Sequence, residues 1–174
     1  MKTRRNILLL TLMLVTLAFF SCNNCGKKYA SADLLVEDLS ANLEVIKVEQ
    51  LKAKLDSFEM FYLIDVREAN EHYYGFIPGS IHVCCGSIAF KMDNNEFWEN
   101  EMTYTPEKTD EIVVYCKKGK RSVLAASLLD HLGYENVKFI EGGWKKWELT
   151  YPLMYEKKLE NLGHTEENAD AGGC

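Results

Sequence analysis

The sequence predicts an α/β domain whose central parallel sheet has about five strands and carries helices on both faces. The first observation is an alternation between residues 44 and 150, where short apolar runs rich in Val and Ile alternate with segments of helical periodicity. The second observation is size, because the chain without its terminal extensions keeps about 110–130 residues, enough for one hydrophobic core. We therefore expect one domain with an extension at each end.

The predicted elements alternate in order along the chain. The run 112–115 is short, apolar and β-branched, which is typical of a buried strand. The segment 122–132 has apolar residues at helical spacing, with Ser122 as N-cap and Gly133 as stop signal. The acidic and aromatic region 93–110 predicts a surface helix rather than a lid. Strands are expected at 45–48, 61–65, 80–83, 112–115 and 137–140, and helices at 49–57, 68–74, 87–92, 96–102, 122–132 and 143–149.

Cys116 lies where a strand ends and a basic loop leads into a helix, a place where ligands bind in parallel α/β sheets. Backbone N–H groups and the positive end of the helix dipole would face the thiol, and Gly119 would allow the tight curl. Such surroundings favour a thiolate, so we expect an ionised nucleophile open to solvent. The alternative is a structural cysteine that ends a core strand. The loop cations are Lys117, Lys118, Lys120 and Arg121.

Four ordered blocks between residues 44 and 147 resemble a single rhodanese domain. The chain departs from that pattern at Phe76, where His is usual, and at Cys84-Cys85 after the third strand; no departure touches the Cys116 loop. The blocks are Tyr62-Leu63-Ile64-Asp65-Val66-Arg67-Glu68, Gly75-Phe76-Ile77-Pro78-Gly79-Ser80-Ile81, Cys116-Lys117-Lys118-Gly119-Lys120-Arg121-Ser122 and the segment from Gly133-Tyr134 to Gly143-Trp144.

The resemblance implies a sulfurtransferase without a cofactor. Cys116 would take a sulfane sulfur from a small donor such as thiosulfate, become a persulfide, and pass the sulfur to cyanide or a thiol. Arg121 would bind the anionic donor or orient the loop. Asp65 and Arg67 match a family pair that we interpret as a salt bridge supporting the fold. The substrate-binding residues would be Lys117, Lys118, Gly119, Lys120 and Ser122, through the loop amides.

Three alternatives to this enzyme remain. Related phosphatase loops place Arg six positions after Cys, whereas Arg121 is five positions after Cys116, and the smaller ring suits a single sulfur atom. A rhodanese fold could also carry sulfur or dock a partner without turnover. A thiol–disulfide protein would pair Cys116 with Cys84 or Cys85, although the sequence has no Cys-x-x-Cys pair.

The N-terminus predicts export. Residues 1–21 combine a basic start with an apolar run of about 21 Å as a helix, which is shorter than a bilayer core and typical of a signal peptide. Cys22 directly follows and resembles the lipidation site of a bacterial lipoprotein; ordinary signal cleavage is the alternative. We expect a tether at 22–43, the domain at 44–155 and a disordered tail at 156–174. The protein would lie in the bacterial periplasm or on a membrane.

Charge and cysteines exclude further classes. A formal net charge of −6 makes nucleic-acid binding a poor interpretation. The six cysteines show no regular spacing for a disulfide framework or a metal site. Cys116 should stay free, and a bond between the neighbours Cys84 and Cys85 would be strained. A monomer or weak dimer is expected from the single-domain resemblance.

Overall fold

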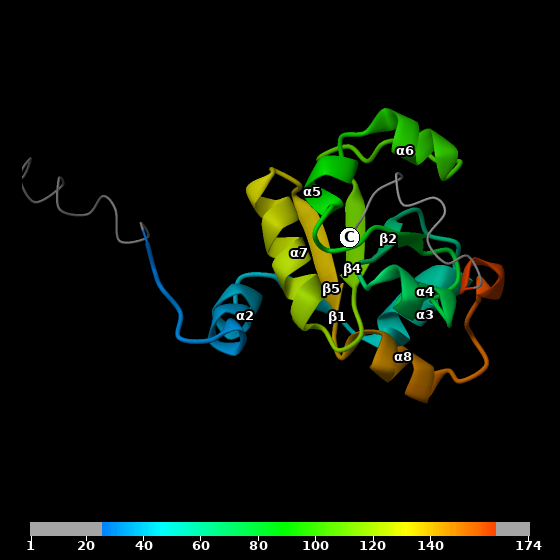
Figure 1. The fold of residues 1–174 in the computed structure, drawn as a ribbon, viewed down its shortest axis with the longest axis horizontal. Helices are drawn as coiled ribbons and strands as arrows, with labels where there is room; N and C mark the ends of the chain where they lie inside the picture. The colour runs from blue at the N-terminus through cyan, green and yellow to red at the C-terminus, as the bar shows by residue number, and fades with distance from the viewer. Residues whose placement is uncertain (1–25, 163–174) are drawn as a thin grey trace, which may run out of the picture. The chain divides into compact units, whose positions relative to one another are not determined.

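The computed structural model describes residues 26–162 and contains a five-stranded sheet in the order β1-β5-β4-β2-β3 (Figure 1). Every registered strand pair is parallel, which confirms the predicted sheet. The chain divides into two units at residue 32, and all strands belong to the second unit. The strands are β1 (Glu44–Ile46), β2 (Tyr62–Asp65), β3 (Ile81–His82), β4 (Glu111–Tyr115) and β5 (Asn136–Ile140).

The helices follow the predicted alternation. No described helix is long and apolar enough to cross a membrane. They are α2 (Ala32–Ser40), α3 (Val48–Asp56), α4 (Ala69–Tyr73), α5 (Ile88–Lys91), α6 (Asn95–Asn100), α7 (Lys120–His131), α8 (Gly143–Thr150) and the 3-10 helix η1 (Leu159–Leu162).

Two hydrophobic clusters cover the two faces of the sheet. Alternate residues of β4 divide between them, since successive side chains of a strand point to opposite faces. Val114 and Cys116 belong to the cluster that includes residues of α5, α6 and α7, whereas Val113 and Tyr115 belong to the cluster of α3 and α8. Helices therefore lie on both faces, as predicted (Figure 1).

The start of the long helix after β4 differs from the prediction. The helix α7 begins at Lys120, so Ser122 lies in its first turn and is not its N-cap. The backbone of Gly119 is left-handed, with φ of 100°, and this lets the chain turn directly from the loop into the helix. The predicted stop is confirmed: Gly133 has φ of 87°, and the amide of Tyr134 donates to the carbonyl of Leu129.

Within the described residues, the segments before and after the domain contain more ordered structure than predicted. The prediction of disorder from residue 156 is wrong for 156–162, because Glu156 exchanges two backbone hydrogen bonds of 3.0 Å with Phe76. The amide of Lys158 also donates to the carbonyl of Tyr73. The predicted tether contains α2. The signal peptide and Cys22 lie outside the described residues.

Candidate functional site

Cys116 directly follows β4, at the edge where the carboxyl ends of the parallel strands meet. We call residues 116–122 the Cys116 loop. The Gly119 amide donates a hydrogen bond of 3.2 Å to Cys116 Sγ, so the curl that the sequence predicted encloses the sulfur with a backbone donor. Ser122 is fully buried and its hydroxyl donates to the Gly119 carbonyl at 2.8 Å. Ser122 therefore holds the curl closed from inside.

The start of α8 holds the outer side of the Cys116 loop. The amide of Trp144 donates to the Cys116 carbonyl at 2.8 Å, and the amide of Lys145 donates to the Lys117 carbonyl at 3.0 Å. This close approach requires Gly143, because a Cβ there would lie 2.1 Å from the Cys116 carbonyl oxygen. The Gly-Gly-Trp motif of the sequence thus serves to dock a helix end on the Cys116 loop.

The expectation that Cys116 is open to solvent is wrong for this structure, since the residue is only 2% exposed. Its side chain belongs to the hydrophobic cluster beneath α7, together with Val66 and Ala125. The first turn of α7 begins only four residues after the cysteine, and residues of this helix pack in the same cluster as its side chain. The residue therefore offers little surface to a donor in this structure.

The cations of the Cys116 loop are mostly paired with acidic side chains. Arg121 Nη2 lies 2.7 Å from Glu71 Oε2, and Arg121 Nη1 lies 3.4 Å from Glu68 Oε1. Lys117 also faces Glu71, at 3.6 Å. Burial acts to raise the pKa of Glu71, but the hydrogen bond and charge of Arg121 outweigh it and leave this pKa lowered. Lys120 pairs with Asp33 at 2.6 Å.

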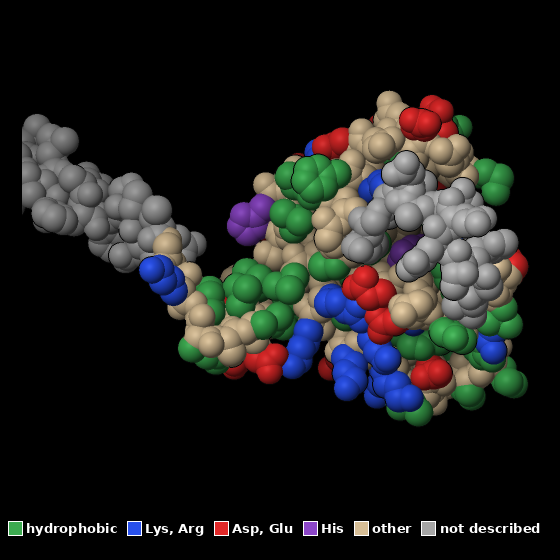
Figure 2. Space-filling model, in the orientation of Figure 1, with side chains coloured by type: hydrophobic (Ala, Val, Ile, Leu, Met, Phe, Trp, Pro, Cys, Tyr) green, Lys and Arg blue, Asp and Glu red, His purple; other side chains and the backbone are tan. Residues whose placement is uncertain are grey.

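A pocket of about 450 Å³ lies beside the Cys116 loop and carries a surplus of cations. Lys117 and Lys118 line it together with Lys145 and Trp144. Figure 2 shows Lys and Arg side chains gathered over the region where the loop after β4 and α8 lie in Figure 1. Glu71 and Glu148 line the same pocket and pair with Lys117 and Lys145. Anion binding by Lys117 and Lys118 stays a prediction.

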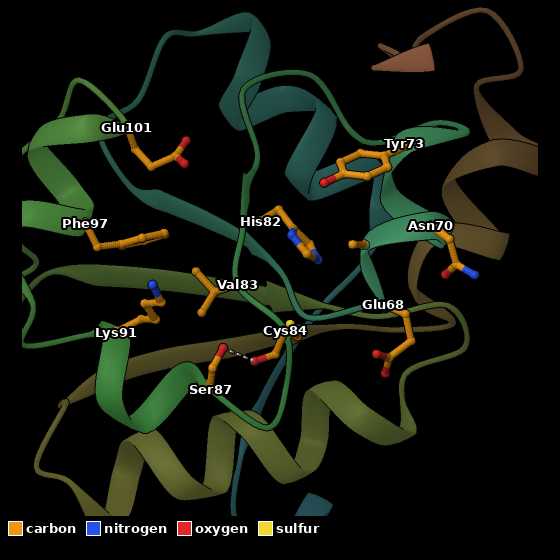
Figure 3. A pocket seen from close by; sticks show the side chains of 11 residues that line it. Glu68, Asn70, Tyr73, His82, Val83, Cys84, Ser87, Lys91, Phe97 and Glu101 are labelled. Atoms are coloured by element: carbon orange, nitrogen blue, oxygen red, sulfur yellow. Dashed lines mark hydrogen bonds between the residues drawn. The ribbon is translucent and has the colours of Figure 1, made fainter. Parts of the chain in front are cut away.

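A second pocket, of about 620 Å³, is lined by Glu68 and Asn70 among other residues (Figure 3). Tyr73 and His82 line it, and Lys91 and Glu101 give it charges of both signs. Cys116 is not among the residues that line either pocket. The second pocket has no residue of the Cys116 loop in its lining at all.

The predicted salt bridge between Asp65 and Arg67 is present and fully buried. Arg67 donates to both carboxylate oxygens, at 2.6 Å to 2.9 Å, and its Nη2 also donates to the Gly75 carbonyl at 2.7 Å. His72 Nδ1 lies 2.9 Å from Asp65 Oδ2. Burial would raise the pKa of Asp65, but hydrogen bonds from His72 and Arg67 leave it lowered. The guanidinium lies 4.7 Å from the Trp144 ring, which links this network to α8.

The cysteines of the described chain differ in state. Cys116 and Cys85 are free, as expected for Cys116, whereas Cys84 is disulfide-bonded. Cys84 and Cys85 are therefore not bonded to each other. Cys85 is partly buried, and its Sγ lies 3.6 Å from the Arg121 carbonyl oxygen, which it can reach as a weak donor.

Sequence reasoning missed the acidic partners of the Cys116 loop. Glu68 and Glu71 come one and four residues after Arg67, at helical spacing, and their charge is opposite to that of the loop. That complementarity was the available signal, but it could be used only once β2 was known to lie beside β4. The sequence places Gly143 in a motif, but it does not reveal that a side chain at this position would clash with the Cys116 carbonyl oxygen.

The comparisons with known proteins agree with this fold. The model of the Rhodanese-like domain matches residues 47–150. A mouse protein, thiosulfate sulfurtransferase/rhodanese-like domain-containing protein 3, is 34% identical over 116 residues, which are 65% of this chain and 73% of the relative. Thiosulfate sulfurtransferase GlpE of Pseudoalteromonas translucida is 31% identical over 112 residues, which are 64% of this chain and 95% of the relative.

The solved structure of the human single-domain sulfurtransferase TSTD1 superimposes with a TM-score of 0.56 at 26% identity, covering 61% of this chain and 96% of the human chain. The family match spans more than half of the chain and includes the strands β2 to β5, the Cys116 loop and all of α8. The chain belongs to the rhodanese-like domain family.

Proposed function

We propose that the protein is a sulfurtransferase that moves a sulfane sulfur from an anionic donor such as thiosulfate to a thiol or cyanide through a persulfide on Cys116. The observation that carries the proposal is the hydrogen bond from the Gly119 amide to Cys116 Sγ within a basic loop. A backbone donor fixed at the sulfur stabilises a thiolate and, after transfer, an anionic persulfide. The sulfurtransferase names of the relatives support the same class.

The reaction has two displacements at sulfur. The Cys116 thiolate attacks the outer sulfur of thiosulfate; the new S–S bond forms while the bond to the sulfonate breaks, and sulfite leaves with the electron pair. A thiolate or cyanide then attacks the outer sulfur of the persulfide, and Cys116 leaves as thiolate. The pocket that Lys117, Lys118 and Lys145 line would concentrate the dianionic donor beside the loop.

A second candidate is a sulfur carrier that loads but barely turns over. The burial of Cys116, at 2% exposure, favours it, because a buried sulfur is hard for an acceptor to reach. The two candidates share the first displacement and differ in the rate of the second.

One experiment separates the two candidates. The full-length protein and Cys116→Ser are incubated with thiosulfate; cyanide-dependent thiocyanate formation is followed, and the mass of the intact protein is recorded before and after adding cyanide. An enzyme turns over many times, and Cys116→Ser abolishes this. A carrier gains one sulfur and keeps it. If neither thiocyanate nor a sulfur adduct at Cys116 appears, the proposal is wrong.

We also propose that the protein is exported and anchored through lipid on Cys22. The basic start, the apolar run and the following cysteine support this. Expression in a bacterium followed by membrane fractionation tests it with Cys22→Ala beside the wild type. The anchored protein should move from the membrane to the soluble fraction in the variant, and equal distribution of both would contradict the proposal.

A further inference from the structure

Cys85 and Cys116 lie on the same face of the sheet, at neighbouring strand ends. The amide of Val66, just beyond β2, donates to the Tyr115 carbonyl at 2.9 Å, and the amide of Cys85, beyond β3, donates to the Val66 carbonyl at 3.3 Å. The side chains of Val66 and Cys116 belong to one hydrophobic cluster, against which Cys85 packs. The two thiols therefore flank Val66 beneath the first turn of α7.

Further contacts bring Cys85 to the Cys116 loop. Cys85 Sγ lies 3.6 Å from the carbonyl oxygen of Arg121, in the first turn of α7. The pKa of the Cys85 thiol is raised, chiefly by burial and next by its electrostatic interaction with Cys116. Both sulfurs are free of disulfides. A second thiol thus lies within electrostatic reach of the proposed persulfide.

From these contacts we propose that Cys85 is a relay thiol, which takes the outer sulfur from the Cys116 persulfide and presents it to the acceptor. This inference rests on the proposed function. The Cys85 thiolate attacks the outer sulfur in line; the new S–S bond forms, the bond to Cys116 Sγ breaks, and Cys116 leaves as thiolate. The proton of Cys85 passes to solvent. No oxidant or reductant is needed, because one persulfide replaces another.

The spacing favours a relay over a disulfide. Two strand spacings put the backbones of Cys85 and Cys116 about 10 Å apart. A direct disulfide needs Cα atoms within about 7 Å of each other, so it would require backbone movement. A persulfide extends the reach of Cys116 by an S–S bond of about 2 Å, so Cys85 needs a smaller movement to reach its outer sulfur than to reach Cys116 Sγ itself.

The relay would make the transferred sulfur more accessible to large acceptor thiols. Cys116 is 2% exposed, whereas Cys85 is only partly buried. Its sequence neighbours Cys84 and Ser87 line the pocket of about 620 Å³ (Figure 3). A small donor anion needs little space to load Cys116, but the thiol of a peptide or protein is larger. Cys85 itself does not line this pocket, but transfer to it would move the sulfur from a residue that is 2% exposed to one that is only partly buried, where a larger thiol can approach more easily.

The experiment determines which cysteine carries the transferred sulfur. Full-length wild type, Cys116→Ser, Cys85→Ser and Ser87→Ala are treated with limiting thiosulfate, without reductant so that Cys84 stays bonded. They are then trapped with an alkylating reagent and mapped by peptide mass spectrometry. In the wild type we expect persulfide chiefly on Cys116, which the Gly119 amide favours, and a smaller but detectable share on Cys85. Ser87→Ala perturbs the same corner, keeps both thiols and should show both adducts.

The variants give distinct outcomes. Cys85→Ser should carry the sulfur on Cys116 alone, and Cys116→Ser on neither residue. Transfer to a peptide thiol should fall roughly tenfold more than transfer to cyanide in Cys85→Ser. Sulfur that never leaves Cys116 in the wild type overturns the relay alone, as does a Cys85–Cys116 disulfide formed with release of hydrogen sulfide. Absence of sulfur from Cys116 in every protein overturns the proposed function itself.

Discussion

The guanidinium of Arg121 lies 2.7 Å from the carboxylate of Glu71, which joins the Cys116 loop to α4. Both side chains are partly buried, with 31% and 21% of their surfaces exposed, so water screens the pair only in part. The arginine that the sequence assigned to donor binding is therefore held by an acid of the protein itself. Its position depends on Glu71, and both charges act on the site.

Removing the positive or the negative member of this ion pair should change the reactivity of Cys116 in opposite directions. Arg121→Gln removes a cation near the sulfur and should slow alkylation of Cys116 at neutral pH roughly tenfold. Glu71→Gln removes an anion and should accelerate it about threefold. Iodoacetamide labelling followed by peptide mapping measures both rates, with Glu148→Gln on α8 as control. Changes in the same direction would show that the pair acts on loop structure and not through charge.

Gly143→Ala should dislodge α8 from the Cys116 loop. A Cβ at this position would lie 2.1 Å from the Cys116 carbonyl oxygen, and the backbone there has φ of 56°. Gly133→Ala is the matched control, because its φ is 87° but no atom lies within 4 Å of the added carbon. The control should cost about 1–2 kcal/mol of unfolding free energy for its backbone strain alone. Gly143→Ala should cost more and also abolish sulfur loading, as measured by urea denaturation and intact mass. Equal costs would contradict the steric argument.

Asp65→Asn should destabilise the fold by about 3–5 kcal/mol, because it leaves the buried guanidinium of Arg67 without its counter-charge. Replacing both partners, as Asp65→Asn with Arg67→Met, should recover at least half of this loss. Urea denaturation of the two proteins gives the comparison. If the double variant is no more stable than the single one, the pair does more than neutralise a buried charge.

Lowering the pH should destabilise the protein at pH values well above those at which its carboxylates titrate. Burial lowers the pKa of His72 below its ordinary 6.5, although Asp65 partly opposes the shift. The unfolded chain then binds more protons than the folded one below pH 6.5, so stability falls as pH decreases from about 7.5 to about 5.5. Glu71 and Asp65 have lowered pKa values and add the same sign only below their ordinary 4.5 and 3.8.

His72→Gln keeps a hydrogen-bond donor for Asp65 but cannot titrate. Its unfolding free energy should depend less on pH across this window than that of the wild type, as measured by urea denaturation at the two pH values. An identical pH dependence in both proteins would exclude His72 as the cause.

Local sequence patterns predicted most of the strands and helices and identified Cys116 as the candidate nucleophile. The strand at 112–115 and the helix that follows were predicted within two residues at each end, because buried β-branched runs and helical spacing are properties of short segments. The curl at Gly119 followed from the same stretch of chain. The four motifs, in order, located Cys116 and the Asp65–Arg67 pair.

Tertiary structure decided what surrounds those residues. Glu71 reaches Arg121 only because β2 lies beside β4, and Cys85 approaches Cys116 only because β3 extends the same sheet. The burial of Cys116 depends on how α7 covers its face, and Glu156 is ordered because it pairs with Phe76, which is 80 positions away in the sequence. Spacing along a chain specifies local geometry, whereas contacts between distant segments depend on strand order and packing.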